Sequence, residues 1–449
     1  MKTIALEEHY VGRAERDAIA HWQENRNMMA KGRTIHEAAR EINIFDEADV
    51  VVVGAGPAGV TAAIASAREG ADTILMERYG HLGGMATGGL VLMLNPSAGQ
   101  GREWMDRLNK INGVHDLSKT KEPEWRHAVM VDPELLKCIL NDMALDTGVR
   151  LLLHSWSTAA VVERNTVKGV IFESKSGRQA VMGKVIVDTT GDGDIFASAG
   201  AEYDASLDKG YRTSELAMVF RIGGIDFDRF ADFRRARPED WVKMRGAGFE
   251  LAGFHIAPVP AQRKDVFWVN SFIRGKSCLK VEDLNWVEVN VRKAMIPLWS
   301  YYKRTVPGFE NSYLYDSASQ TGTRGSRRLI GEYVLSGEEA KAGKKFDDTV
   351  LIFPQGVPLT WPAERPPENV EMPYRCLVPA KLEGLLAAGR CFSSDQAANS
   401  MFNVISHCIQ MGQAAGTAAA LAVKSKVEPR KVDIRALQRR LSAQGVELP

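Results

Sequence analysis

Residues 49–87 read DVVVVGAGPAGVTAAIASAREGADTILMERYGHLGGMAT, and this stretch decides the fold. DVVVV is a short run of β-branched residues, which is typical of a parallel strand that is buried on both faces. TAAIASAREG follows with helix-forming residues and a closing glycine, and TILMER has the pattern of a second strand. The stretch therefore predicts one β-α-β unit of about 30 residues.

The turn between the first strand and the helix, GAGPAG, has the spacing G-x-G-x-x-G. Gly54 permits the tight turn, Gly56 lets the backbone approach a pyrophosphate, and Gly59 lets the helix pack closely on the strand. The phosphates then face the free N–H groups and the positive dipole end of the helix. Glu77 ends the second strand, 18 residues after Gly59, where a carboxylate accepts hydrogen bonds from a ribose diol. We predict a dinucleotide-binding segment; the alternative is a plain β-α-β turn.

The composition narrows the class of protein. A chain of 449 residues is long enough for two or three structural units. Its 57 Lys and Arg residues nearly balance its 56 Asp and Glu residues, which argues against nucleic acid as the main partner. The five cysteines form no C-x-x-C pair, and this fits a reducing compartment rather than a disulfide framework or a zinc site. The first residues, MKTIALEEHY, lack the apolar stretch of a signal peptide, and no apolar run approaches the roughly 18 residues of a membrane span. We therefore expect a soluble cytoplasmic protein that works without a membrane.

Further strands and helices are predicted on both sides of the first unit. VDPELLKCILNDMALDTG is a predicted helix with Asp132 as its N-cap. The predicted strands are VRLLLHS (149–155), TAAVVERN (158–165), VKGVIFES (167–174), KVIVD (184–188) and GLLAAGR (384–390). A long helix, VISHCIQMGQAAGTAAALAVKS (404–425), follows the last of these strands. The late strand is expected to return to the same sheet as the first one.

Four blocks in one order carry a more specific signal: ERYGHLGGMATGG (77–89), DTTGDGDIFASAGAEY (188–203), SRRLIGEYVLS (326–336) and LLAAGRCFSSDQAANSMFNVISHCIQMGQAAGTAAALAV (385–423). They resemble the FAD-dependent oxidoreductase family, which is related to the fumarate reductase and succinate dehydrogenase flavoproteins. The resemblance covers residues 48 to about 203 and 325–424. It implies FAD as the cofactor. It also implies an α/β fold, with a Rossmann-like FAD-binding domain of the glutathione reductase type and an inserted α+β substrate domain.

This resemblance divides the chain into five segments. We expect an N-terminal arm (1–46), the first part of the FAD-binding domain (47–204), a substrate or cap domain (205–375), the second part of the FAD-binding domain (376–430) and a C-terminal tail (431–449).

The resemblance also assigns cofactor-binding positions. On the nucleotide and loop side they are Gly54, Gly56, Pro57, Ala58, Gly59, Glu77, Arg78, Gly83, Gly84, Met85, Ala86, Thr87, Ala159, Gly191, Gly389 and Arg390. At the flavin end, the backbone of Asn403, Val404 and Ile405 is implied to face the N1–C2=O2 edge. Reduced flavin carries negative charge there, and a helix N-terminus stabilises it. Relatives usually carry arginine at the position of Asn403, so the charge partner of the flavin is left open.

Two of the three candidate catalytic residues are His407 and Tyr374. Histidine titrates near neutral pH, and His407 follows the flavin-facing turn, so we predict a general acid or base; a histidine satisfied at a domain boundary is the alternative. Tyr374 precedes the return of the chain to the FAD-binding domain, where it could donate to a substrate oxygen or simply pack.

Arg324 is the third candidate. It lies with Arg327 and Arg328 in TGTRGSRRLIGEY, and arginine binds carboxylates through a bidentate fork. This cluster could hold an acidic substrate, or one member could pair with Glu332 and fix the domain junction. No metal is predicted, because the two acids of TGDGD are too few oxygen ligands for calcium.

We expect a flavoenzyme that transfers a hydride between a small organic substrate and flavin N5. The reaction is either dehydrogenation of a C–H next to oxygen or nitrogen, or reduction of an activated C=C. The alternatives are an FAD monooxygenase, although a second G-x-G-x-x-G for NAD(P)H is missing, and an electron-transfer subunit with a redox partner protein. A tRNA-modifying flavoprotein is disfavoured by the near-zero charge. A homodimer through the N-terminal arm and oxygen as the electron acceptor stay open.

Overall fold

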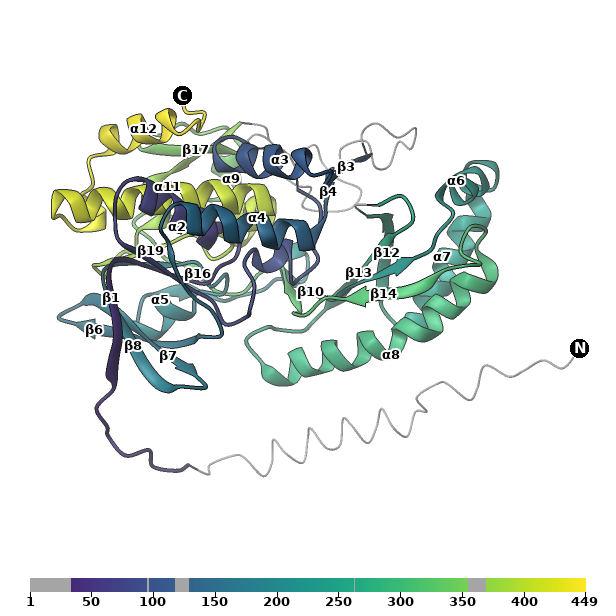
Figure 1. Cartoon of the computed structure of the whole chain (residues 1–449), viewed down its shortest axis with the longest axis horizontal. Helices are drawn as coiled ribbons and strands as arrows, with labels where there is room; N and C mark the ends of the chain where they lie inside the picture. Colours follow the sequence, from purple (N-terminus) through teal and green to yellow (C-terminus); the bar gives the residue numbers. More distant parts are fainter. Residues whose placement is uncertain (1–33, 95–96, 118–128, 262, 354–368) are drawn as a thin grey trace, which may run out of the picture.

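The computed structural model describes residues 34–94, 97–117, 129–261, 263–353 and 369–449. Two sheets organise these residues, one toward each end of the long axis (Figure 1). Most of the predicted N-terminal arm, residues 1–33, lies outside the described residues. The strand β1 begins at Asn43, inside the last part of that arm.

The first sheet has seven strands and joins distant parts of the chain. Five strands run parallel, in the order β5 (Arg150–Leu152), β2 (Thr73–Met76), β1 (Asn43–Val53), β8 (Gly177–Asp188) and β19 (Leu385–Ala387). The antiparallel strands β7 (Thr166–Ser174) and β6 (Trp156–Glu163) extend from the first half of β8. The return of the late strand β19 to the sheet of β1 confirms the prediction from GLLAAGR.

The valine run fits its place because β1 is covered on both faces. Val50 and Val52 belong to a core with the helices α2 (Pro57–Arg68), α4 (Pro133–Asp146) and α11 (Ile405–Ser425). Val51 and Val53 belong to a second core, which is formed with β7 and α5 (Asp194–Ser198). Alternate side chains of a strand point to opposite faces, so a strand buried on both sides requires an uninterrupted apolar run. Asp132 caps α4 as predicted, because its carboxylate accepts hydrogen bonds from the next turn.

Two glycines let α11 cross α2 at unusually short range. A Cβ atom on Gly412 would lie 2.0 Å from the carbonyl oxygen of Ala58, and one on Gly416 would lie 2.0 Å from that of Ala62. The hydroxyl of Thr61 donates to the carbonyl oxygen of Ile409 at 2.8 Å across the same interface. The first turn of α2 is therefore held at a fixed position against the first half of α11.

The second sheet is antiparallel and has six strands. It contains β14 (Tyr313–Ser317), β11 (Val219–Gly223), β13 (Phe267–Arg274), β10 (Glu215–Ala217) and β15 (Gly322–Thr323) in this order, and β12 (His255–Pro260) pairs with β13. The helices α6 (Phe227–Ala236), α7 (Pro238–Ala252) and α8 (Val281–Thr305) accompany it at the right of Figure 1. Edge-to-face aromatic contacts of Phe230 with Trp241, Phe267 and Phe309 build its core. This unit confirms the predicted α+β insertion.

Several later elements pack on the core of the first sheet. The strands β17 (Thr349–Phe353) and β18 (Val370–Pro373) lie inside the predicted substrate domain, but their buried side chains belong to the core of α2 and α11. The predicted tail contains the helix α12 (Ile434–Ala443), whose Leu437 and Leu441 enter that core. The smaller elements are α3 (Gln100–Lys110), β3 (Val114–Asp116), β4 (Val129–Val131), β9 (Tyr203–Asp204), β16 (Arg328–Leu329), α9 (Gly337–Lys341) and α10 (Gln396–Phe402).

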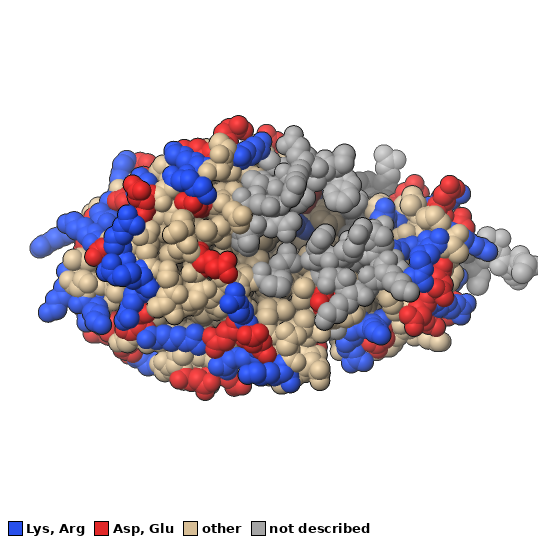
Figure 2. All heavy atoms as spheres, turned by 90° about the horizontal axis from the view of Figure 1, so that it is seen from above, with Lys and Arg blue, Asp and Glu red and all other residues tan. Residues whose placement is uncertain are grey.

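Two surface features bear on the partners of the protein. On the face shown in Figure 2, the described Lys and Arg side chains are interspersed with Asp and Glu, rather than gathered into one basic field. No helix among the described residues is long and apolar enough to span a membrane.

Candidate functional site

The three glycines of GAGPAG have different roles in the turn between β1 and α2. Gly54 has a φ angle of +93°, and a Cβ atom there would lie 2.7 Å from the carbonyl oxygen of Thr189. A Cβ atom on Gly59 would lie 1.7 Å from the carbonyl oxygen of Gly54. A Cβ atom on Gly56, by contrast, would meet no protein atom within 4 Å. Gly56 therefore faces open space at the N-terminus of α2, which has no side-chain cap and begins at Pro57.

A second glycine loop closes over the same space. Gly83 donates its N–H to the carbonyl oxygen of Ala55 at 2.8 Å. Gly84 begins a short 3₁₀ turn, Gly84–Ala86, and a Cβ atom on it would lie 2.8 Å from the Cα atom of Gly56. Thr87 ties the loop together, because its hydroxyl donates to the carbonyl oxygen of Leu82 at 2.6 Å. The predicted positions from Gly83 to Thr87, with Met85 and Ala86 between them, thus lie at the entrance to α2.

Glu77 lies in a pocket beside this turn. The pocket is lined by Val53, Gly54, Met76, Glu77, Arg78, Ser155, Trp156, Ser157, Thr190 and Asp194. The carboxylate of Glu77 accepts the N–H of Ala55 at 2.7 Å and the N–H of Tyr79 at 2.9 Å. Burial raises the pKa of Glu77, and these two N–H groups act against that rise. A carboxylate offers about four acceptor positions, so room remains for the hydroxyl groups of a ribose.

Ala159, a predicted cofactor contact, does not line this pocket. It pairs with Ile171 further along β6, while the start of that strand supplies Trp156 and Ser157 to the pocket.

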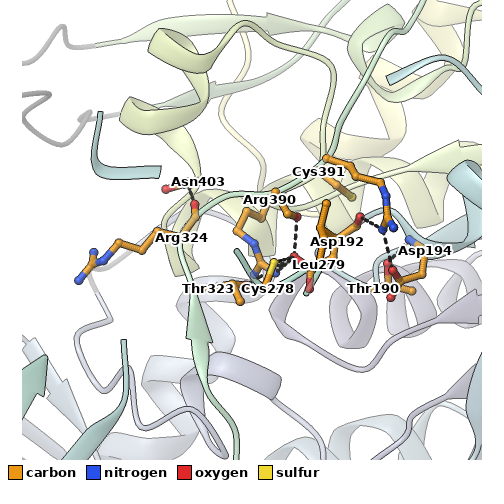
Figure 3. Close-up of polar contacts among 12 residues, drawn as sticks. Thr190, Asp192, Asp194, Cys278, Leu279, Thr323, Arg324, Arg390, Cys391 and Asn403 are labelled. Atoms are coloured by element: carbon orange, nitrogen blue, oxygen red, sulfur yellow. Dashed lines mark hydrogen bonds and ion pairs between the residues drawn. The ribbon is translucent and has the colours of Figure 1, made fainter. Parts of the chain in front are cut away.

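A buried ion-pair cluster, shown in Figure 3, holds the end of β8 against the segment after β15. Arg390 Nη2 lies 2.7 Å from Asp192 Oδ1, which also accepts the hydroxyl of Ser326 at 2.6 Å. Burial pushes the pKa of Asp192 upward, but the charge of Arg390 and the bond from Ser326 outweigh it and hold the pKa below its usual value. A Cβ atom on Gly191 would lie 2.8 Å from the Arg390 guanidinium. Arg390 and Gly191 therefore contact each other in this cluster.

The arginines of TGTRGSRR divide into two groups. Arg327 Nη1 lies 2.9 Å from Asp194 Oδ1, and the fully buried Arg328 donates to Asp204. These two arginines fix the junction, although neither pairs with Glu332, which pairs with Arg430 instead. The side chain of Arg324 runs away from Arg390 and Asp192 in Figure 3.

Asn403 is the point where α10, α11 and the second sheet meet. Its side-chain N–H group donates to the carbonyl oxygen of Arg324, which follows β15. Its side-chain oxygen accepts a hydrogen bond from Arg212, whose Nη2 also donates to the carbonyl oxygen of Ser400 at 2.9 Å. Val404 is the N-cap of α11 and has no side-chain cap bond, so the N–H groups from Ile405 onward lack a side-chain acceptor at the cap.

The strand β19 connects this point to the glycine turn. A Cβ atom on Gly389 would lie 3.0 Å from the Cβ atom of Ala58 and 4.0 Å from Cys408 Sγ. The ends of both helices, α2 and α11, therefore meet at the carboxyl end of the parallel sheet. This is the edge where open α/β sheets bind their ligands. Open space at Gly56, the Glu77 pocket and two helix N-termini without side-chain caps fit an extended dinucleotide.

Sequence reasoning did not find Arg212. It lies in a 3₁₀ turn, Arg212–Ser214, ahead of β10, and no sequence motif marks it. The one signal was the presence of Asn403 where relatives usually carry arginine, which left the charge partner of the flavin open.

The structure brings neither His407 nor Tyr374 to the side chain of Arg324. His407 is 2% exposed, its Nδ1 lies 3.2 Å from the carbonyl oxygen of Phe402, and its ring centroid lies 4.7 Å from that of Phe353. The hydroxyl of Tyr374 donates to the carbonyl oxygen of Pro429 at 2.8 Å, and burial raises the pKa of Tyr374. These contacts are those of a packing residue, and a catalytic role of Tyr374 stays a prediction.

The buried carboxylate of Asp188 gives a prediction on pH. It is fully buried and accepts the N–H and hydroxyl of Thr190 and the N–H groups of Ile195 and Phe196. Burial raises the pKa of Asp188 to about 6, although these bonds oppose the rise. The folded state therefore binds the proton more tightly than the unfolded chain, and the contribution of Asp188 to stability falls as the pH rises from about 4 to about 6.

We expect Asp188→Asn to be less stable than the native protein, because an amide offers one acceptor oxygen to four donors. The deficit should be largest near pH 4 and should shrink until about pH 6, since the variant lacks the titrating group. Urea unfolding of both proteins at pH 4, 5, 6 and 7 measures this difference. A deficit that is independent of pH would contradict the raised pKa.

In the part of the chain that the structure describes, no group of three or more His, Cys, Asp or Glu side chains could hold a metal ion. All five cysteines are free.

The geometry agrees with the comparison to known proteins. Thiamine thiazole synthase from Methanococcus vannielii is 29% identical over 153 residues, which are 32% of this chain and 56% of that protein. Digeranylgeranylglycerophospholipid reductase 1 from Methanococcoides burtonii is 22% identical over 246 residues, which are 51% of this chain and 59% of that protein. The chain thus spans 56% and 59% of the length of these curated relatives.

Among solved structures, a geranylgeranyl bacteriochlorophyll reductase-like protein from Thermoplasma acidophilum has 14% identity and a TM-score of 0.45, over 89% of this chain and 83% of that chain. The p-nitrophenol 4-monooxygenase from Pseudomonas putida has 11% identity and a TM-score of 0.46, over 89% of this chain and 88% of that chain. The family described as FAD dependent oxidoreductase matches residues 49–441, nearly the whole length described above. The chain therefore belongs to the FAD-dependent oxidoreductase family of enzymes, and its cofactor is FAD.

Proposed function

We propose that the protein transfers a hydride between a small organic substrate and N5 of bound FAD. The observation that carries this proposal is the contact at Asn403. There the segment after β15, from the antiparallel sheet, is hydrogen-bonded to the turn that begins α11. The sheet predicted to bind substrate is thereby joined to the turn predicted to face the flavin ring.

Different parts of the chain suit different parts of FAD and the substrate. The open space at Gly56 and the N-terminus of α2 suit the pyrophosphate, and the carboxylate of Glu77 suits the ribose. The backbone from Asn403 to Ile405 suits the flavin ring, and Arg324 orients substrate from the other sheet. FAD, when bound, supplies the centre that accepts or donates the hydride. A proton-transfer role of His407 stays a prediction, because its ring lies among Phe353 and Phe402.

A relative supports one direction of transfer. The similarity to a digeranylgeranylglycerophospholipid reductase supports reduction of a C=C over dehydrogenation. The finer resemblance to fumarate reductase and succinate dehydrogenase flavoproteins stays a prediction, as do the homodimer, the electron-acceptor partner and the cytoplasmic location.

Anaerobic spectroscopy of the purified protein tests this function. We expect a yellow protein whose flavin absorbance, once bleached by dithionite, returns on addition of α,β-unsaturated acids or ketones. Saturated analogues serve as matched controls and should leave the protein bleached. Bleaching of the oxidised protein by alcohols or amines would reverse the direction, and a colourless protein that takes up no FAD would refute the function.

A further inference from the structure

Two arginines lie next to one carboxylate beside Asn403, and a third, Arg212, is within range of its charge. Glu215, on β10, is buried, and its Oε1 lies 3.0 Å from Arg274 Nε. Its Oε2 lies 3.6 Å from Arg324 Nε, too far for a well-made hydrogen bond. Arg274 is 69% exposed, whereas Arg324 is 18% exposed. The shorter contact of Glu215 is thus made with Arg274, which is largely exposed to solvent.

Arg212 and Arg324 share the single negative charge of Glu215, which lies 3.6 Å from Arg324 and makes its best contact with Arg274. Arg212 donates hydrogen bonds to two neutral groups, the carbonyl oxygen of Ser400 and the side-chain oxygen of Asn403. The Nε atoms of both arginines are buried without a hydrogen-bond partner. Burial lowers the pKa of Arg212 to about 9, the charge of Arg324 adds to this effect, and Glu215 opposes it.

A nearby thiol does not supply the missing charge. Burial raises the pKa of Cys408 to about 11, so this thiol is neutral at pH 7. Partly buried cations that are incompletely neutralised are costly, and a bound anion lowers that cost. The uncapped start of α11, next to Asn403, adds the positive end of a helix dipole to the same region.

The wall beside Arg324 is apolar and aromatic. The Arg324 guanidinium lies 5.0 Å from the ring centroid of Phe272 on β13. Phe272, Asn270 and Trp268 alternate along β13 and so share one face. Trp268 donates to the carbonyl oxygen of Leu90, in the segment after the second glycine loop, so this face looks toward the FAD-binding domain. The side-chain oxygen of Asn270 is buried there without a partner.

We propose that Arg212 and Arg324 form the binding site for the carboxylate group of the substrate, and that the face of β13 with Phe272 holds its apolar part. The substrate class is therefore a carboxylic acid with a planar or apolar body. This inference rests on the proposed hydride transfer, because it places the acid beside the flavin-facing turn. It gives Arg212 and Arg324 a joint role in which the carboxylate bridges the two guanidinium groups.

Binding to the oxidised holoenzyme tests the site. Sodium cinnamate and sodium benzoate are titrated by calorimetry, with cinnamamide and benzamide as neutral probes of the same shape. We expect each acid to bind at least about tenfold more tightly than its amide, since hydrogen bonds to charged groups are the stronger ones. Arg212→Met and Arg324→Met should each weaken binding of the acids by about 10- to 100-fold and leave binding of the amides unchanged.

Arg274→Met is the matched control, because Arg274 contacts the same Glu215 but is mostly exposed. It should change the affinity for the acids less than about twofold. Flavin content and circular dichroism of each variant separate a lost site from a lost fold, and Arg324→Lys keeps the charge if Arg324→Met does not fold. Equal affinity of the native holoenzyme for acids and amides would overturn the site. A native enzyme with no preference for acids, together with a shifted flavin midpoint potential in Arg212→Met, would also overturn it, because Arg212 would then act on the flavin. A colourless protein would instead overturn the proposed function.

Discussion

A Gly56→Val variant is expected to fold and to purify without FAD. The φ angle of Gly56 is −67°, which valine adopts readily, and an added Cβ atom meets no protein atom within 4 Å. The fold therefore tolerates the valine side chain. The same side chain fills the space in front of α2 where a pyrophosphate would bind. We expect FAD affinity to fall at least about 100-fold, or about 3 kcal/mol. Absorbance at 450 nm per mole of purified protein, and FAD titration by fluorescence, measure the loss.

The matched control is Gly246→Val on α7, which likewise places a Cβ atom in open space but lies on the other sheet's helices. It should retain FAD. Without FAD, the free energy of unfolding of Gly56→Val should be only about 1 kcal/mol below that of the native protein. This small loss is expected because valine is a poor N-cap residue. Full FAD content in Gly56→Val would show that the phosphates lie elsewhere.

The double variant Gly412→Ala/Gly416→Ala is expected to lose about 4 kcal/mol of unfolding free energy. Each new methyl group would lie 2.0 Å from a backbone oxygen of α2, which cannot rotate out of the way. The two helices must move apart by more than about 1 Å, and the close packing between them is lost along its length. Urea unfolding followed by circular dichroism measures the change, and FAD affinity should fall with it because Ala58 shifts away from Gly389.

Gly246→Ala is expected to raise the free energy of unfolding in the same assay. Its Cβ atom meets nothing, so alanine should stabilise α7 by about 0.5–1 kcal/mol through its higher helix propensity. If the double variant in α11 were as stable as the native protein, the close crossing of α2 and α11 would be wrong.

The sequence predicts the parts of the fold that local chemistry determines. The run DVVVV favours a strand buried on both faces, because a half-exposed strand commonly alternates apolar and polar residues. The spacing of Gly54, Gly56 and Gly59 predicts the turn, and each glycine has the contacts expected of it. The return of GLLAAGR to the first sheet follows from family order rather than from any local pattern.

The remaining site depends on contacts between residues far apart in the sequence. Arg212 meets Asn403 across a separation of 191 residues, and no period or motif connects the two. Arg327 and Arg328 look equivalent to Arg324 in TGTRGSRR, yet backbone direction after β15 sends them to different acids. For the same reason the segment of β17 and β18, next to the substrate domain in sequence, packs on the core of α11.

The crossing of α2 and α11 also has a consequence for how the protein matures in the cell. Thr61 finds its partner Ile409 only after a further 348 residues have been synthesised. The nascent chain exposes the face of α2 that later contacts α11 throughout that interval, so chaperones have a binding surface until α11 has been synthesised. Stable FAD binding accordingly has to wait for the synthesis of α11, and chains that stop before β19 are expected to be open to proteolysis.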